Sequence, residues 1–167
     1  MPSCVVARYD GPYTGRVIDA DTHEPIAGAV VLGVWYREFP GPAGEINEFY
    51  DAEEAVTDKS GEFSLPGMGL QVLSNINISS LLIYKAGYDC LEASTWDSLK
   101  IDLLLRKKIG WEGEKAIIPI RKLSNKEGRI RSIPSRPDIP ITKMRVLTNE
   151  INTERREQGL QPLSLER

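Results

Sequence analysis

The sequence predicts an all-β protein, an antiparallel β-sandwich with a helical extension at its C-terminus. Short apolar or alternating stretches are separated at regular spacing by glycine, proline and aspartate. That pattern is typical of a sandwich built from short strands. The first 120 residues contain no long stretch with helical periodicity. A charged, proline-interrupted segment follows, and only there does a substantial helix become favoured.

The clearest strands lie at residues 13–19 and 29–37, joined by a polar connection rich in turn-forming residues. In the second strand, Val30, Leu32 and Val34 fall on one face. Val31 and Trp35 fall on the other face, so both faces are expected to be at least partly covered.

Five further strands are expected at 52–57, 62–65, 81–85, 100–106 and 115–121. Two prolines and two glycines within residues 38–50 predict an exposed loop there. The sequence Asp58-Lys59-Ser60-Gly61 predicts a tight hairpin turn leading into residues 62–65. Pro119 places the last strand at a sheet edge or marks a strand end, because proline cannot donate to the ladder.

The chain changes character after Arg121. Residues 124–127 form a capping-box sequence that predicts a short helix ending before Pro134. Residues 134–140 hold three prolines and predict an extended linker. A longer helix is expected over residues 142–158, with a glycine after it as a C-terminal cap.

That longer helix has an apolar face formed by Met144, Leu147 and Ile151. Such a face is not expected to remain exposed in water on an isolated helix. We therefore expect residues 122–158 to dock on the sandwich, with Ile130 and Ile133 helping to bury the short helix. The alternative is a recognition helix that stays undocked until a partner binds.

Charge is unevenly distributed along the chain, although the net charge is only −3. Residues 1–105 hold 6 Lys or Arg against 16 Asp or Glu, giving −10, whereas residues 106–167 hold 15 against 8, giving +7. The basic segment lacks interleaved aromatic residues, so nucleic-acid binding is not expected. Pairing of the basic segment with the acidic one is the favoured interpretation.

With these strands placed, the residues follow the pattern of a known family. They are Gly15, Val17, Pro25, Gly28, Val31, Asp58, Gly61, Phe63, Gly87 and Tyr88. In this order and spacing the chain resembles the carboxypeptidase regulatory-like domain over about residues 13–121. The resemblance implies a seven-stranded Greek-key sandwich, the transthyretin-like or prealbumin-like fold. It leaves residues 1–12 as a lead-in and residues 122–167 as a helical extension.

Each of these ten residues has an explanation in the fold. Valine and phenylalanine positions are expected in the core, and Gly61 in a turn that requires positive φ. The ring of Tyr88 is expected to pack over one end of the sandwich while its hydroxyl finds a partner.

The resemblance implies a non-catalytic module of the cell envelope, used for contact with an unknown protein or glycan or as a structural spacer. The alternative is an enzyme of unrecognised class, with a site near the 19–24 turn and the 38–50 loop. One histidine, His23, is present, so the multi-histidine sites of transthyretin-like hydrolases and of intradiol dioxygenases are not expected. No cofactor and no metal are predicted. Asp19, Asp21 and Glu24 are more readily explained as turn-forming residues than as weak Ca²⁺ ligands.

The resemblance implies a periplasmic or secreted location, with membrane contact only through a lipid anchor. Cys4 follows Ser3 near the N-terminus and precedes a tether-like lead-in, so it is a possible lipid-attachment residue of a longer precursor. The given chain itself shows no signal peptide. Pairing of Cys4 with Cys90, or two reduced thiols, remain open alternatives.

Overall fold

A computed structural model of the chain describes residues 7–42, 44–72, 75–100 and 109–166. Its strands are β1 (Ala7–Asp10), β2 (Tyr13–Asp19), β3 (Val30–Gly41), β4 (Gly44–Val56), β5 (Glu62–Leu65), β6 (Gly69–Val72), β7 (Ile76–Tyr84), β8 (Leu91–Ala93), β9 (Gly110–Glu112) and β10 (Lys115–Ile120). Its α-helices are α1 (Lys126–Arg131) and α2 (Arg145–Glu157), and short 3-10 turns span Asp97–Lys100 and Ile141–Lys143.

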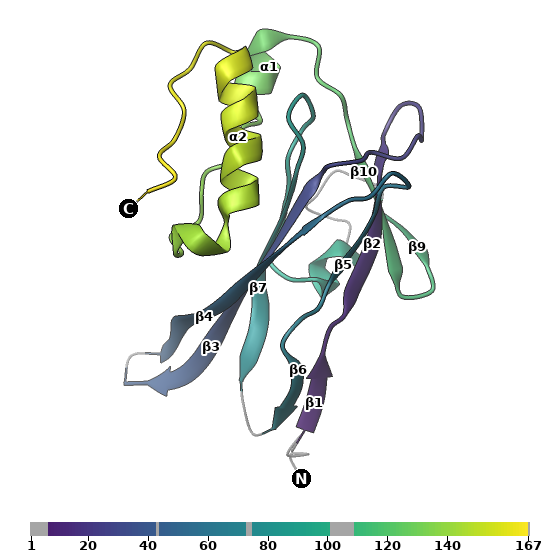
Figure 1. Cartoon of the computed structure of the whole chain (residues 1–167). Helices are drawn as coiled ribbons and strands as arrows, with labels where there is room; N and C mark the ends of the chain where they lie inside the picture. The colour runs from purple at the N-terminus through teal and green to yellow at the C-terminus, as the bar shows by residue number, and fades with distance from the viewer. Residues whose placement is uncertain (1–6, 43, 73–74, 101–108, 167) are drawn as a thin grey trace.

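Two four-stranded sheets pack as a sandwich, with strand orders β5-β2-β10-β9 and β4-β3-β7-β8 (Figure 1). A separate two-stranded ribbon, β1 with β6, extends from one end. The prediction of a β-sandwich is therefore confirmed. The described part of the chain nevertheless has ten strands rather than seven, partly because residues 7–10 of the expected lead-in form a strand.

The core lies between the sheets, where alternate residues of each strand point inward. Val17, Val31, Leu65, Ile83 and Ile118 are completely buried there. The strand predictions at 13–19, 62–65 and 115–121 match β2, β5 and β10 closely. The strand expected at 100–106 lies almost wholly outside the described residues.

The prediction of a purely antiparallel sandwich is wrong at one pair, because β10 runs parallel to β2 from Ala116↔Gly15 to Ile120↔Asp19. About a hundred residues separate these strands in the sequence, so no hairpin constrains their direction. β10 is an interior strand rather than an edge strand, but Pro119 is its next-to-last residue, as the strand-end alternative predicts. Pro119 is tolerated because the neighbour β9 pairs only with residues 115–117, so the proline lies beyond that ladder.

The exposed loop predicted at 38–50 is wrong as well: β3 and β4 form a continuous hairpin from Val30↔Val56 to Gly41↔Gly44. Its prolines and glycines cluster at the tip, where a missing N–H is least costly. A register shift at Trp35/Tyr36 absorbs one extra residue of β4.

The 58–61 turn forms, but it does not close a hairpin. β4 belongs to one sheet and β5 to the other, where β5 pairs with β2, so the turn is a crossing between the two sheets. Asp58 Oδ1 accepts from the backbone N–H groups of Ser60 at 2.8 Å and Glu62 at 3.0 Å. The turn chemistry predicted for Asp58 is correct, although the pairing is different.

Helix α2 covers the outer face of the β4-β3-β7-β8 sheet and makes a third layer (Figure 1). Met144, Leu147 and Ile151 are buried against Val30 and Leu32 of β3, which confirms the predicted docking. The expected contribution of Ile130 is wrong, because this side chain is 36% exposed.

Charged side chains fix both ends of this docked helix. The Glu54 carboxylate on β4 accepts from the N–H groups of Val146 at 3.0 Å and Leu147 at 2.7 Å, at the positive end of the helix dipole. Farther along α2, the fully buried Glu154 accepts from Gly87 N–H at 2.5 Å and contacts Arg129 Nε at 2.8 Å. Carboxylates and backbone N–H groups thus join the sandwich and the extension, whereas the Glu154–Arg129 ion pair lies within the extension.

The short helix α1 is capped by Asn125 rather than by Ser124 of the predicted capping box. The side chain of Asn125 accepts from Gly128 N–H at 2.6 Å. Across residues 7–42, 44–72, 75–100 and 109–166, no helix is long and apolar enough to cross a membrane.

Candidate ligand-binding hollow

The residues of the family pattern lie where the chain needs them for packing or turns. Gly15 is buried, and a Cβ there would approach the ring of Phe63 to 2.5 Å. Gly28, Gly61 and Gly87 all have positive φ, at 74°, 75° and 86°. These roles account for the glycines without a ligand.

Other members of the pattern support turns and sheet ends. Pro25 forms an isolated bridge with Ile18, and Tyr88 forms one with Lys122. The ring of Tyr88 is half-buried against the core, and burial raises the pKa of its hydroxyl. Cys4 lies outside the described residues, so the structure gives no account of it.

The acidic 19–24 turn is stabilised internally. Asp19 Oδ1 accepts from the N–H groups of Asp21 at 2.8 Å and Thr22 at 3.1 Å. His23 has φ 62°, and its N–H donates to the Asp19 carbonyl at 2.9 Å. These contacts are the turn-forming chemistry that the sequence indicates.

The 19–24 turn and the 38–50 segment lie at opposite ends of the sandwich (Figure 1). The turn follows the end of β2, close to the start of β3, whereas residues 38–50 extend from the far end of β3. The described residues therefore do not bring these two segments together into one site.

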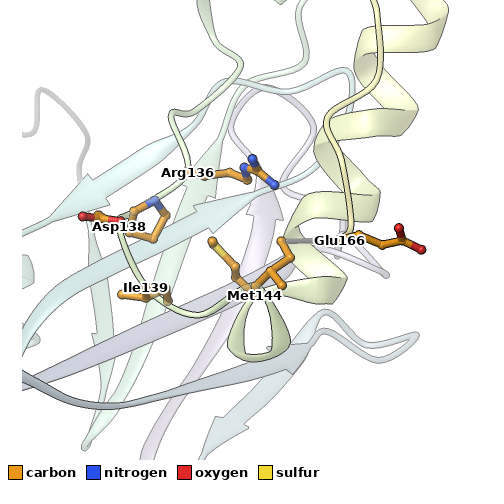
Figure 2. A pocket seen from close by; sticks show the side chains of 7 residues that line it. Arg136, Asp138, Ile139, Met144 and Glu166 are labelled. Atoms are coloured by element: carbon orange, nitrogen blue, oxygen red, sulfur yellow. The ribbon is translucent and has the colours of Figure 1, made fainter.

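One hollow lies between the C-terminal segment and the start of α2 (Figure 2). It is lined by Ile139 and Met144 among others, and measures about 220 Å³. The carboxylates of Asp138 and Glu166 point away from it in Figure 2. Arg136 donates to the Ser164 carbonyl at 2.8 Å, so its guanidinium serves the local packing of the tail. This hollow presents few free polar groups to a ligand.

A second hollow, of about 290 Å³, is richer in polar side chains and is the better candidate. It lies at the end of the sandwich where β2 and β7 begin. We call it the Asp10 hollow. It is lined by Arg8, Asp10, Tyr13, Glu38, Asn77, Ile78, Ser79, Thr95, Trp96 and Asp97.

The carboxylate of Asp10 organises the floor of this hollow. Asp10 is 5% exposed and accepts three hydrogen bonds. The donors are the Tyr13 hydroxyl at 2.6 Å, the Trp35 indole Nε1 at 2.8 Å and the Met68 N–H at 2.8 Å. These bonds tie β1, β2 and β3 together and hold the neighbouring rings in fixed positions.

Aromatic rings form one wall of the Asp10 hollow. The Tyr13 ring lies 5.1 Å from the Trp96 ring and 6.2 Å from the Trp35 ring, between centroids. Trp96 also packs edge-on against Trp111, with 6.0 Å between the ring centroids. Tilted and edge-on contacts at these distances are favourable for aromatic pairs, so the Trp96 ring is rigidly placed.

The loop that carries Trp96 is fixed by its own side chains. Ser98 N–H donates to Thr95 Oγ1 at 3.0 Å, and Thr95 N–H donates to Ser98 Oγ at 3.1 Å. This reciprocal pair holds the start of the 3-10 turn.

The rim of the Asp10 hollow is polar, and its residues come from β1, β3 and β7. The Arg8 guanidinium donates to the Ile76 carbonyl, which brings β1 against β7. Glu38 N–H donates to the Asn75 carbonyl at 2.9 Å, fixing β3 beside the same strand. Asn77 and Ser79 of β7 are half-exposed at the rim.

The Tyr13 hydroxyl stays neutral over a wide pH range. Burial raises its pKa above the ordinary value, and the hydrogen bond it donates to the Asp10 carboxylate raises the pKa further. At neutral pH this phenol therefore donates to Asp10 and its ring remains an uncharged surface.

Sequence reasoning missed this hollow. Residues 1–12 are expected from the sequence to form a loose lead-in, although Arg8 and Asp10 lie within them and line the hollow. The weak signal was the alternation of Ala7-Arg8-Tyr9-Asp10, which is compatible with a short strand. Nothing in the local sequence links these residues to Asn77 or Trp96, which only the fold brings close.

The chain matches no family model, no curated protein and no solved structure. Within the described ranges, no group of three or more His, Cys, Asp or Glu side chains could hold a metal ion.

Proposed function

We propose that this protein is a non-catalytic binding module of the cell envelope, of the carboxypeptidase regulatory-like type, and that its Asp10 hollow takes a sugar unit of a glycan. The envelope location and the family rest on the sequence resemblance. The ligand class rests on the composition of the hollow.

One observation carries the ligand class: amide, hydroxyl, carboxylate and guanidinium groups surround a rigid indole ring. A sugar ring has hydroxyl groups that both donate and accept, together with an apolar face of C–H groups. Asn77 supplies a donor and an acceptor, and the Ser79 hydroxyl, which donates to the Asn77 carbonyl at 3.3 Å, supplies an acceptor. The half-buried Tyr13 ring supplies an apolar surface, backed by the Trp96 ring, which is 7% exposed.

The size of the hollow supports a small ligand. About 290 Å³ lies at the lower end of the roughly 300–1,000 Å³ typical of small-molecule sites. A single ring, with the rest of the chain continuing into solvent, suits this size. Binding of a single sugar unit in so small a site is expected to have low affinity. Several copies of the module on a repeating glycan would bind with higher avidity.

Saturation-transfer NMR with a panel of soluble monosaccharides and their short oligomers tests the proposal. We expect at least one sugar to receive magnetisation from the protein, and Asn77→Ala to weaken its binding about tenfold, because a hydrogen-bonding rim group is lost. Asn149→Ala, an exposed position on α2 far from the hollow, is the matched control and should bind normally. Equal binding by both variants, or no transfer to any sugar at tens of millimolar, would overturn the proposal.

A further inference from the structure

The hairpin of β3 and β4 extends beyond the sandwich as an arm, which we define as residues 38–50 (Figure 1). The β3–β7 ladder ends at Arg37↔Ile76, and one further backbone bond joins Glu38 to Asn75. Past that point the described residues of the arm pair only with each other. A two-stranded ribbon without a covering layer is marginally stable in water, so an arm of this length is suited to contact with another molecule.

The arm carries exposed apolar side chains on one face. Phe39 pairs directly with Ile46 across the hairpin, and these side chains are 39% and 54% exposed. Tyr50 is 42% exposed. The guanidinium of Arg37 lies 4.8 Å from the Tyr50 ring centroid and 5.9 Å from that of Phe39. These rings therefore already hold one guanidinium group.

β4 is also an edge strand, first in the order of its sheet. The C-terminal extension covers only one part of that edge. There Lys143 pairs with Asp51 at 2.6 Å, and Glu54 of β4 caps the start of α2. Residues 44–50 lie beyond this cover. An uncovered edge presents backbone N–H and C=O groups that an extended segment can pair with.

Charge identifies the partner. β4 contains five acidic residues and no basic one, and two of the five, Glu45 and Glu48, lie within residues 44–50. A second copy pairing through the same edge would bring carboxylates opposite carboxylates, which is destabilising. Glu48 shares a face of the arm with Ile46, whereas Glu45 lies on the opposite face. A segment with basic side chains on both of its faces would place cations beside each of them instead.

We propose that the edge of β4 at residues 44–50 binds an extended arginine- or lysine-rich segment of a partner protein as an added strand. Basic side chains on one face of that segment would lie beside Glu48 and the aromatic rings, and those on its other face beside Glu45. Its backbone would continue the β-ladder.

The probe is a ten-residue peptide in which Val-Val pairs alternate with Arg-Arg pairs, so that both faces of the added strand carry Arg. It is compared with the same peptide carrying Glu in place of Arg. We expect the Arg peptide to bind, to bind less tightly as salt rises, and to slow hydrogen exchange of β4 amides within 44–50. The Glu peptide should not bind.

Two double variants carry the same change in charge. Glu45→Lys with Glu48→Lys should weaken binding about tenfold, through the loss of two exposed ion pairs and added repulsion. Glu112→Lys with Glu114→Lys, at exposed positions on the β9–β10 hairpin, should change the affinity less than about twofold. Equal weakening by both pairs, or binding without protection of residues 44–50, would overturn the proposal. Concentration-dependent self-association through the arm without peptide would overturn it as well.

Discussion

Gly61 has two separate reasons to be glycine. Its φ is 75°, and a Cβ would lie 2.5 Å from the Val17 carbonyl oxygen, which is backbone and cannot move away easily. Gly113 also has positive φ, at 62°, but a Cβ there would meet nothing within 4 Å. A side chain at Gly113 would therefore add backbone strain alone, whereas a side chain at Gly61 would add both backbone strain and a steric collision.

We expect Gly113→Ala to lower the free energy of unfolding by about 1 kcal/mol, the cost of a left-handed residue with a side chain. Gly61→Ala should cost about 1–3 kcal/mol more, because the collision with Val17 is added. Chemical denaturation of both variants measures the difference. Equal losses would show that the crossing between the sheets tolerates a side chain at Gly61.

The Tyr13 hydroxyl should make stability depend on alkaline pH. Its pKa in the folded protein is raised above the unfolded value of about 10, by burial and by the hydrogen bond to Asp10. The stability it contributes is fully present below pH ~10 and is lost as pH rises beyond that value toward the folded pKa. Tyr13→Phe should remove this part of the alkaline loss, which denaturation at pH ~9 and ~11 measures. An unchanged pH dependence in the variant would contradict the assignment.

At the scale of elements, the central packing event is the burial of α2 on the sheet. Leu147 is completely buried, whereas its neighbour Val146 is 40% exposed. We expect Leu147→Ala to destabilise the protein by about 2–5 kcal/mol, the usual cost of a core cavity. Val146→Ala should cost less than about 1 kcal/mol.

Hydrogen exchange is a second, independent test that α2 is docked on the sheet. Amides of residues 147–155 should be protected in the parent protein, at high as well as low salt, because apolar burial dominates the docking. Exchange at unfolded-peptide rates would contradict a docked α2.

Periodicity and turn residues predicted most strands and the docking face of α2, because these features are local. Residues 38–50 were misassigned because proline and glycine mark a hairpin tip as readily as a loop. The 58–61 turn was identified, but the sheet to which the next strand belongs depends on long-range pairing with β2. The Asp10 hollow was not predictable for the same reason: its lining residues come from distant parts of the chain.

At the scale of the whole molecule, the two ends of the sandwich differ. The end of β7 at Tyr84 lies beside the tail, where Glu150 accepts from Ala86 N–H at 2.9 Å. The start of β7 lies at the Asp10 hollow, close to the base of the arm. The tail thus stabilises one end and one face, while the candidate binding surfaces share the opposite end.

The central claim is that the Asp10 hollow is the ligand site, and the tryptophan indoles test it most directly. The chain has three tryptophans, so a ¹H–¹⁵N spectrum shows three indole N–H signals. Trp96 lines the hollow, whereas the Trp35 N–H is bonded to Asp10, and Trp111 packs edge-on against Trp96 without lining the hollow. On titration with the sugars that receive saturation transfer, the account predicts the largest shift at Trp96. A larger shift at Trp111, or unchanged indole signals while the sugar binds, would contradict it.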